Sequence, residues 1–259
     1  MYILALDQGT SSSRAILFNL KGAIIALEQK EFTQIYPQNG WVEHNPLEIL
    51  TTQIEVAKNI FKNNNIDVQS VIGIGIANQR ETTVLWNKKT GQPYHNAIVW
   101  QDKRTANYCN ELKGAYSNLI QSKTGLLIDS YFSASKINWL INNVEGIEKA
   151  IEDNEVAFGT IDTWLLWNLT NGRVHATDTS NASRTLLFNI NTLEWDDALL
   201  DLFAVPKSIL PEVKNSADNY GETNFIDGTT MLPIYALVGD QQAALIGHNC
   251  WEKIGRAHV

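Results

Sequence analysis

The chain has 259 residues, of which 44% are hydrophobic and 19% charged, and this composition is typical of a globular domain large enough to bury a core. Its formal net charge of −8 argues against a nucleic-acid-binding surface or an anionic-membrane surface, so we expect neither kind of partner. Cys109 and Cys250 form no CxxC motif, and the apolar run at residues 2–6 is too short for a signal peptide or a membrane span. We therefore expect a cytoplasmic protein with reduced cysteines.

Turn-forming residues separate three apolar segments at the start of the chain. Residues 7–13 are small and polar and include a glycine that can adopt a positive φ, and Lys21-Gly22 supplies a second turn. This alternation of apolar runs and turns predicts an antiparallel meander of three strands. The predicted strands are residues 2–6, 14–20 and 23–29.

Helices and strands are predicted to follow one another along the rest of the chain. Pro46 suits a first helical position after Asn45, and apolar residues recur at helical spacing as far as Phe61. Residues 71–77 form a continuous apolar run with glycines, which is typical of a buried strand. The sequence therefore predicts an α/β domain with a mixed sheet. Further predicted strands are residues 82–86, 97–100 and 233–238, and further predicted helices are residues 105–113, 133–142, 160–169 and one that begins within 243–246.

The turn after the first strand carries groups that suit phosphate oxygens. Thr10, Ser11 and Ser12 offer hydroxyls and successive backbone N–H groups, and Arg14 can donate two parallel hydrogen bonds. Asp7 would repel phosphate unless a divalent cation lay between them, so we expect it to hold Mg²⁺ directly or through water. An ordinary polar hairpin turn is the alternative. The chain contains neither a P-loop nor a GxGxxG pattern, which argues against P-loop NTPases, protein kinases and dinucleotide enzymes.

Two polar segments follow apolar strands, and ligands of open α/β sheets gather beyond such strand ends. Arg80 can donate to hydroxyl oxygens and Glu81 can accept from hydroxyl hydrogens, so together they could bind a polyol. A surface ion pair between strand ends is the alternative reading of these two residues. Asp240 follows Gly239, where it could cap a helix that runs from Gln241 onward. This capping role could coexist with a role in chemistry.

Several motifs, in this order, resemble the FGGY carbohydrate kinases, and within them the glycerol kinases. An Asp, Gly and Thr turn in an N-terminal hairpin is similar to the first phosphate motif of the actin/hexokinase/Hsp70 ATPase superfamily. The segments that carry the closer resemblance are LALDQGTSSSRAILF at 4–18, NQRETT at 78–83, DSYFSASKINWL at 129–140 and GDQQAA at 239–244. The resemblance runs from residue 2 to about residue 252, and it implies an actin-like, ribonuclease H-like α/β fold.

The resemblance implies an enzyme that transfers the terminal phosphate of ATP to glycerol, with Mg²⁺, giving sn-glycerol 3-phosphate. Asp240 would be the general base, because a carboxylate can accept the alcohol's proton as the P–O bond forms. Lys136 and Trp139 are expected to pack structurally, and Trp100 could also be an ordinary core residue. The glycerol contacts that the resemblance implies are Arg80, Glu81, Trp100, Tyr131, Asp240 and Gln241.

Two other readings stay open at the level of sequence. One is another FGGY kinase that acts on a pentulose or a tetritol, because the width of a pocket cannot be read from a motif. The other is an actin- or Hsp70-like assembly or chaperone module, which would share the phosphate turn without needing Arg80, Glu81 or Asp240 in a polyol pocket.

The resemblance also implies how the chain is organised. Residues 1–252 correspond to the N-terminal, polyol- and phosphate-binding domain, and the C-terminal nucleotide-binding domain of the family is absent. We therefore expect this fragment alone to be inactive and the full-length enzyme to be a homo-oligomer. Residues 253–259 do not resemble the family and can be back-translated as a common sequencing adapter, so we expect an artefact there. Residues 224–231 lack the basic, glycine-rich loop that binds fructose 1,6-bisphosphate in some bacterial glycerol kinases.

Overall fold

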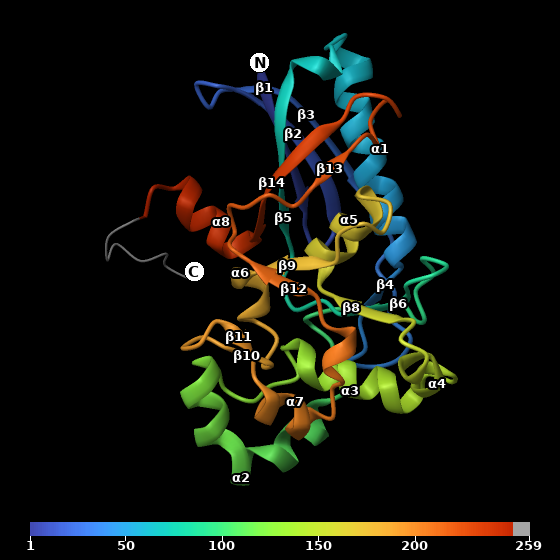
Figure 1. Cartoon of the computed structure of the whole chain (residues 1–259), viewed down its shortest axis with the longest axis vertical. Coiled ribbons are helices and arrows are strands. Elements are labelled where there is room, and N and C mark those ends of the chain that lie inside the picture. Colours follow the sequence, from blue (N-terminus) through green and yellow to red (C-terminus); the bar gives the residue numbers. More distant parts are fainter. Residues whose placement is uncertain (251–259) are drawn as a thin grey trace.

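A computed structural model describes residues 1–250 of the protein (Figure 1). Its main sheet is mixed and is built around the first strand of the chain. β1 pairs antiparallel with β2, and β2 pairs antiparallel with β3, so the predicted meander is confirmed. On its other side β1 pairs parallel with β5, which pairs parallel with β14. In the described residues the order of the strands is β13 (Glu222–Thr223), β14 (Leu232–Gly239), β5 (Val71–Asn78), β1 (Tyr2–Gln8), β2 (Ser12–Asn19) and β3 (Ile24–Glu31).

A long helix, α1 (Pro46–Asn64), covers one face of this sheet (Figure 1). It begins as predicted, because the Asn45 side chain accepts a hydrogen bond from the N–H of Leu47. It ends at Asn65, whose left-handed backbone lets its N–H donate to the Phe61 carbonyl. The apolar face of α1 packs on the buried side chains of the meander. These contacting residues include Leu4, Leu6, Ala15, Leu17, Ile49, Val56 and Ile60.

The residues of a second hydrophobic core come largely from helices and short strands that lie below the main sheet in Figure 1. Its buried residues include Ile98, Ile137, Phe158 and Phe203. The helices and 3-10 turns outside α1 are η1 (Val68–Ser70), α2 (Ala106–Thr124), α3 (Ser133–Asn143), α4 (Ile147–Glu152), α5 (Ile161–Leu169), α6 (Thr179–Ala182), α7 (Asp197–Phe203), η2 (Lys207–Ile209) and α8 (Asp240–Gly247). The short strands are β4 (Glu43–His44), β6 (Val84–Asn87), β7 (Ala97–Ile98), β8 (Val156–Gly159), β9 (Ala176–Asp178), β10 (Phe188–Asn189), β11 (Glu194–Trp195) and β12 (Glu212–Lys214).

Several predicted boundaries were wrong: β1, β2, β3 and β6 each differ by two residues at one end, and three further cases have a clear local cause. α2 continues to Thr124 instead of residue 113, and its left-handed C-cap is Gly125. β7 stops at Ile98, because the chain then turns with Asp102 N–H donating to the Val99 carbonyl. α8 begins at Asp240, three residues before the predicted start. No helix within residues 1–250 is long and apolar enough to cross a bilayer. The predicted artefact at 253–259 lies outside the described residues.

Candidate active site

The ends of three parallel strands bring the predicted site residues to one edge of the sheet. Gln8 at the end of β1 and Gly239 at the end of β14 are both in register with Asn78 at the end of β5. The turn after β1 also bonds directly to the segment after β5, since the Gln79 N–H donates to the Gln8 carbonyl at 2.7 Å. The phosphate turn, the Arg80-Glu81 pair and Asp240 therefore leave the sheet side by side.

Arg80 and Asp240 form an ion pair across this edge. Arg80 Nε lies 3.3 Å from Asp240 Oδ1 and 4.0 Å from Glu81 Oε1, and Nη1 donates to Gln242. The buried Arg80 Nε meets hydrogen-bond geometry with none of the described residues, so its contact with Asp240 is an ion pair without a hydrogen bond. Gly239 makes the close approach possible, because a Cβ there would lie 2.5 Å from Arg80 Cδ.

Asp240 is the first residue of α8 and not its N-cap. The cap residue is Gly239, and it has no side chain to bond the first turn, so the capping alternative for Asp240 was wrong. Asp240 Oδ1 instead accepts from the N–H of Gln241, at 2.7 Å. With 40% of its side chain exposed, the Asp240 carboxylate is open to a ligand at the sheet edge.

The Asp7 carboxylate lies close enough to Asp240 for the two charges to interact. Burial raises the pKa of Asp7, the Arg14 guanidinium lowers it, and the charge of Asp240 raises it. Arg14 Nη1 bonds Asp7 at 3.1 Å, and Arg14 Nε donates to Gln29. The guanidinium expected to meet phosphate is thus paired with Asp7 in this structure.

The hydroxyls of the turn have different environments. Thr10 Oγ1 accepts from Trp100 Nε1 at 3.0 Å, which joins the phosphate turn to the predicted substrate pocket. Ser12 is buried at the start of β2, and its hydroxyl accepts from Gln29. Ser11 is exposed. A tight turn holds all three, with the Gly9 N–H donating to the Ser12 carbonyl.

Trp100 and Tyr131 line the same site. Their ring centroids are 5.3 Å apart, and both residues are partly buried. The pKa of Tyr131 is raised by burial first and then by Glu81 and Asp240, whereas Arg80 lowers it. The aromatic pair therefore faces the charged cluster.

Glu81 is buried in an unusual backbone conformation. Its φ is 61°, in the left-handed region, and the Thr82 N–H donates to the Arg80 carbonyl across it at 2.7 Å. Such three-residue turns with positive φ are rare and strained, and strain of this kind gathers at functional sites. Burial raises the pKa of Glu81, and the cations of Arg80, Arg184 and Lys136 oppose that effect.

Arg184 is the site residue that sequence reasoning missed. Its Nε donates to Glu81 Oε1 at 2.6 Å. The segment TSNASRT at 179–185 resembles the family, but no local pattern assigns it a partner 103 residues earlier in the chain.

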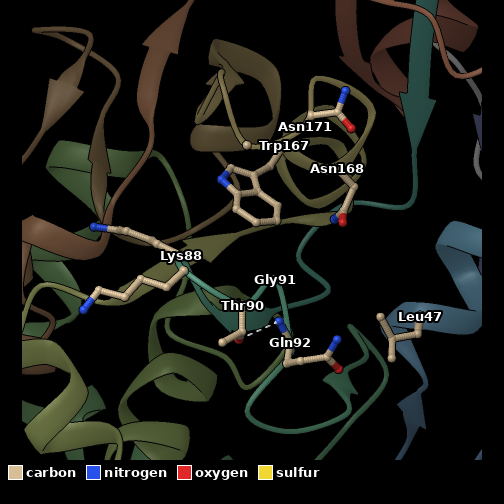
Figure 2. Close-up of a pocket in the computed structure, with 10 residues that line it drawn as sticks. Leu47, Lys88, Thr90, Gly91, Gln92, Trp167, Asn168 and Asn171 are labelled. Carbon is tan, nitrogen blue, oxygen red and sulfur yellow. Dashed lines mark hydrogen bonds between the residues drawn. The ribbon is translucent and has the colours of Figure 1, made fainter. Parts of the chain in front are cut away.

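A separate surface concavity of about 450 Å³ carries none of the predicted residues (Figure 2). The cations at its rim already have partners, because Lys88 Nζ donates to Asn154 and Lys89 Nζ bonds Glu155. A Cβ at Gly91 would lie 3.3 Å from the Trp167 ring, so part of the indole packs closely against backbone. Because none of the predicted site residues lies in this concavity, the sheet edge is the candidate active site.

Known proteins match this chain over nearly its whole length. Residues 2–247 match the N-terminal domain of the FGGY family of carbohydrate kinases. Glycerol kinase of Chromobacterium violaceum is 57% identical over 250 residues, which are 96% of this chain and 50% of that protein. Glycerol kinase of Dichelobacter nodosus is 56% identical, and the matched residues are 97% of this chain and 51% of that protein.

A solved structure shows the same architecture. Plasmodium falciparum glycerol kinase, crystallised with ADP, is 38% identical and has a TM-score of 0.93 over 97% of this chain and 51% of that one. This chain thus spans about half the length of the relatives that it matches. The predicted actin-like α/β fold is confirmed by this likeness, and the chain belongs to the FGGY family of carbohydrate kinases.

Proposed function

We propose that the protein to which this chain belongs is a glycerol kinase, which moves the terminal phosphate of ATP to glycerol and yields sn-glycerol 3-phosphate and ADP. The observation that carries this proposal is the meeting of the Arg80–Asp240 ion pair and Glu81 with the phosphate turn at one sheet edge. The similarity to glycerol kinases at 57% identity supports glycerol over other substrates.

Asp240 is proposed as the general base. A glycerol hydroxyl gives its proton to the Asp240 carboxylate while its oxygen bonds the terminal phosphorus, and the bond from phosphorus to the ADP oxygen breaks. Because phosphoryl transfer is loose, much of this contribution is orientation of the hydroxyl. The contacts of Asp240 Oδ1 with the Gln241 N–H and Arg80 support this role, since they hold the carboxylate in place.

The glycerol contacts follow from the donors and acceptors at the sheet edge. Arg80 donates to the hydroxyl oxygens, and Glu81 accepts their hydrogens. Glu81 Oε1 already accepts from Arg184, and within residues 1–250 its Oε2 receives no hydrogen bond. Trp100 would pack against the carbon chain, and the Tyr131 hydroxyl would hydrogen-bond a hydroxyl of glycerol, with Gln241 as a further contact.

The phosphate turn would receive the terminal phosphates of ATP through its backbone N–H groups and hydroxyls. Thr10, Ser11 and Ser12 supply these donors, and Arg14 would exchange part of its bonding to Asp7 for phosphate oxygens.

The residues present fit a magnesium ion. The interacting charges of Asp7 and Asp240 favour a cation between them, and Asp7 offers the hard oxygen ligand that Mg²⁺ prefers. Residues 1–250 contain no group of three His, Cys, Asp or Glu side chains that could hold a metal, which agrees with an ion bound mainly by water and phosphate. Asp7 would hold the magnesium ion directly or through water, and the positive charge of the ion would offset the negative charge of the phosphate oxygens.

A cytoplasmic location and a homo-oligomeric full-length enzyme are part of the proposal, as the family resemblance implies. Cys109 and Cys250 form no disulfide, which suits a reducing compartment.

The proposal is tested by ADP release from the complete protein with a panel of glycerol, erythritol, xylulose and gluconate. We expect the highest kcat/KM with glycerol. A higher value with the tetritol or the pentulose would reassign the substrate within the family. Nucleotide-dependent polymerisation without any polyol-dependent ADP release would favour an actin-like module.

A further inference from the structure

We propose that Arg184 is a positioning residue for substrate binding, which holds the Glu81 carboxylate in the orientation that accepts the substrate's hydroxyl hydrogens. The inference rests on the proposed function, because Glu81 is the proposed acceptor, but it concerns a residue to which the family motifs assign no role.

The carboxylate of Glu81 depends on Arg184 for its hydrogen bonding. Arg184 Nε donates to Oε1 at 2.6 Å, and this is the only hydrogen bond to the Glu81 side chain from residues 1–250. The Glu81 side chain is 2% exposed and that of Arg184 is 22% exposed, so the pair is largely shielded from water. A charge-assisted hydrogen bond in such a setting orients both groups strongly.

The backbone of Glu81 is held by other residues. Its carbonyl accepts from the hydroxyls of Thr83 and of Ser133 at the start of α3. These bonds stabilise the strained turn at φ 61° but do not reach the carboxylate. Backbone and side chain of Glu81 are thus positioned separately. Within residues 1–250 Arg184 alone donates a hydrogen bond to the side chain, and Arg80 Nε contributes a longer ion-pair contact at 4.0 Å.

Arg184 is itself fixed from two sides. Its guanidinium carbon lies 4.9 Å from the Phe132 ring centroid and 5.8 Å from that of Tyr131, a distance range for cation–π contact. Its N–H donates to the Asn181 carbonyl in α6, and Ser180 of the same helix accepts from the Gly239 N–H. Arg184 therefore connects Glu81 with the strand end that carries Asp240.

The charged groups around Glu81 determine how its pKa would change if Arg184 were removed. Arg80, Arg184 and Lys136 face its carboxylate, together with the Tyr131 phenol. Lys136 Nζ already donates to the carbonyls of Tyr131 and Phe132, so it is not placed to replace Arg184. Burial raises the pKa of Glu81, and Arg184 opposes this, so removing Arg184 raises that pKa further. Protonation turns one Glu81 oxygen into a donor and removes the charge that makes the carboxylate a strong acceptor, so binding of the substrate hydroxyls weakens as pH falls.

The test compares Arg184→Met with wild type in the complete protein, using steady-state kinetics with glycerol and ATP. We expect KM for glycerol to rise about 10- to 100-fold, with a much smaller change in kcat and in KM for ATP. KM for glycerol should depend more strongly on pH in the variant than in wild type, falling as pH rises, because loss of Arg184 raises the pKa of Glu81. Arg184→Lys keeps the cation, so it should restore the pH profile of wild type and only part of the affinity.

Arg173→Met is the matched control, because its guanidinium bonds only the backbone oxygens of Thr170 and Glu222. It should leave KM for glycerol and its pH profile unchanged. An unchanged KM in Arg184→Met, or a loss confined to kcat, would overturn the proposal.

A carboxyl ¹³C titration of Glu81 tests the same contact without turnover. We expect a higher pKa in Arg184→Met, or in Arg184→Lys if the first variant does not fold, than in wild type. An equal pKa and an equal KM contradict the inference. If wild type fails to phosphorylate glycerol, the proposed function is wrong. The titration still decides whether Arg184 controls the protonation state of the Glu81 carboxyl.

Discussion

At the sheet edge, neighbouring groups hold the carboxylates in one orientation, and these carboxylates differ in how far they are exposed to a ligand. Asp240 begins a helix, pairs with Arg80 and stays 40% exposed, so one carboxylate is both held and reachable. Glu81 shows the opposite case, a carboxylate that is 2% exposed and paired with Arg184. The chemistry proposed for each follows from this difference in exposure.

Asp240→Asn tests the general base. Asparagine keeps the shape of the side chain but cannot take the proton, so we expect kcat to fall by about 10²- to 10⁴-fold in the complete protein, with a smaller change in KM for glycerol. The partly buried Asp218, whose side chain within the described residues bonds only the N–H of the next residue, gives a matched control as Asp218→Asn. A near-normal kcat in Asp240→Asn would remove Asp240 from this role.

Gly239→Ala tests the close packing behind the ion pair. The new methyl group would lie 2.5 Å from Arg80 Cδ and 2.9 Å from Gln242 Oε1, so Arg80 must move. We expect kcat/KM for glycerol to fall by about tenfold or more, since a displacement of a positioning group by 1 Å can cost about a hundredfold. In Gly114→Ala, within α2, a Cβ meets no atom within 4 Å, and this control should keep full activity.

At the scale of elements, helix ends explain both the successes and the errors of sequence reading. α1 starts and stops at asparagines whose capping is local, and its start at Pro46 was predicted. The start of α8 was missed because a glycine N-cap has no side-chain signal. The end of α2 was missed because Gly114 and the polar pair Ser117 and Asn118 hide its continuation on a largely exposed helix.

The first turn of α5 holds a buried carboxyl that should make stability depend on pH. Asp162 accepts from the hydroxyls of Thr160 and Thr177, and burial followed by the charge of Asp178 raises its pKa to about 6. The folded state then binds a proton more tightly than the unfolded chain, so stability is fully present below about pH 4 and declines up to about pH 6.

Asp162→Asn should remove that decline. We expect the Tm of wild type to fall relative to that of the variant as pH rises from 4 to 7, measured by circular dichroism in buffers of equal ionic strength. Parallel Tm curves over this range would show that Asp162 does not carry the effect.

At the scale of the whole molecule, the site lies on an open edge. Asp7 and Asp240 are 32% and 40% exposed, and the chain matches about half the length of its relatives. Phosphoryl transfer requires that the nucleotide be clamped and water excluded, as happens between two lobes.

The polypeptide of residues 1–259 by itself should therefore keep glycerol-pocket geometry but lose nearly all kinase activity. The measurement is ADP release by this polypeptide and by the complete protein at equal concentration. Robust ATP-dependent phosphorylation of glycerol by residues 1–259 alone would contradict the expectation.

Local patterns in the sequence determined the opening meander, the buried strand β5, the capped helix α1 and the family to which the chain belongs. Strand alternation, capping and motif order act over a few residues, so they can be read without coordinates. Only the tertiary structure decided which distant side chains meet. Arg184 bonds Glu81, which lies 103 residues earlier in the sequence, and Trp100 bonds Thr10, which lies 90 residues earlier. Arg14 donates a hydrogen bond to Asp7 on the neighbouring strand. These contacts depend on strand register and on packing between layers, which no short segment encodes by itself.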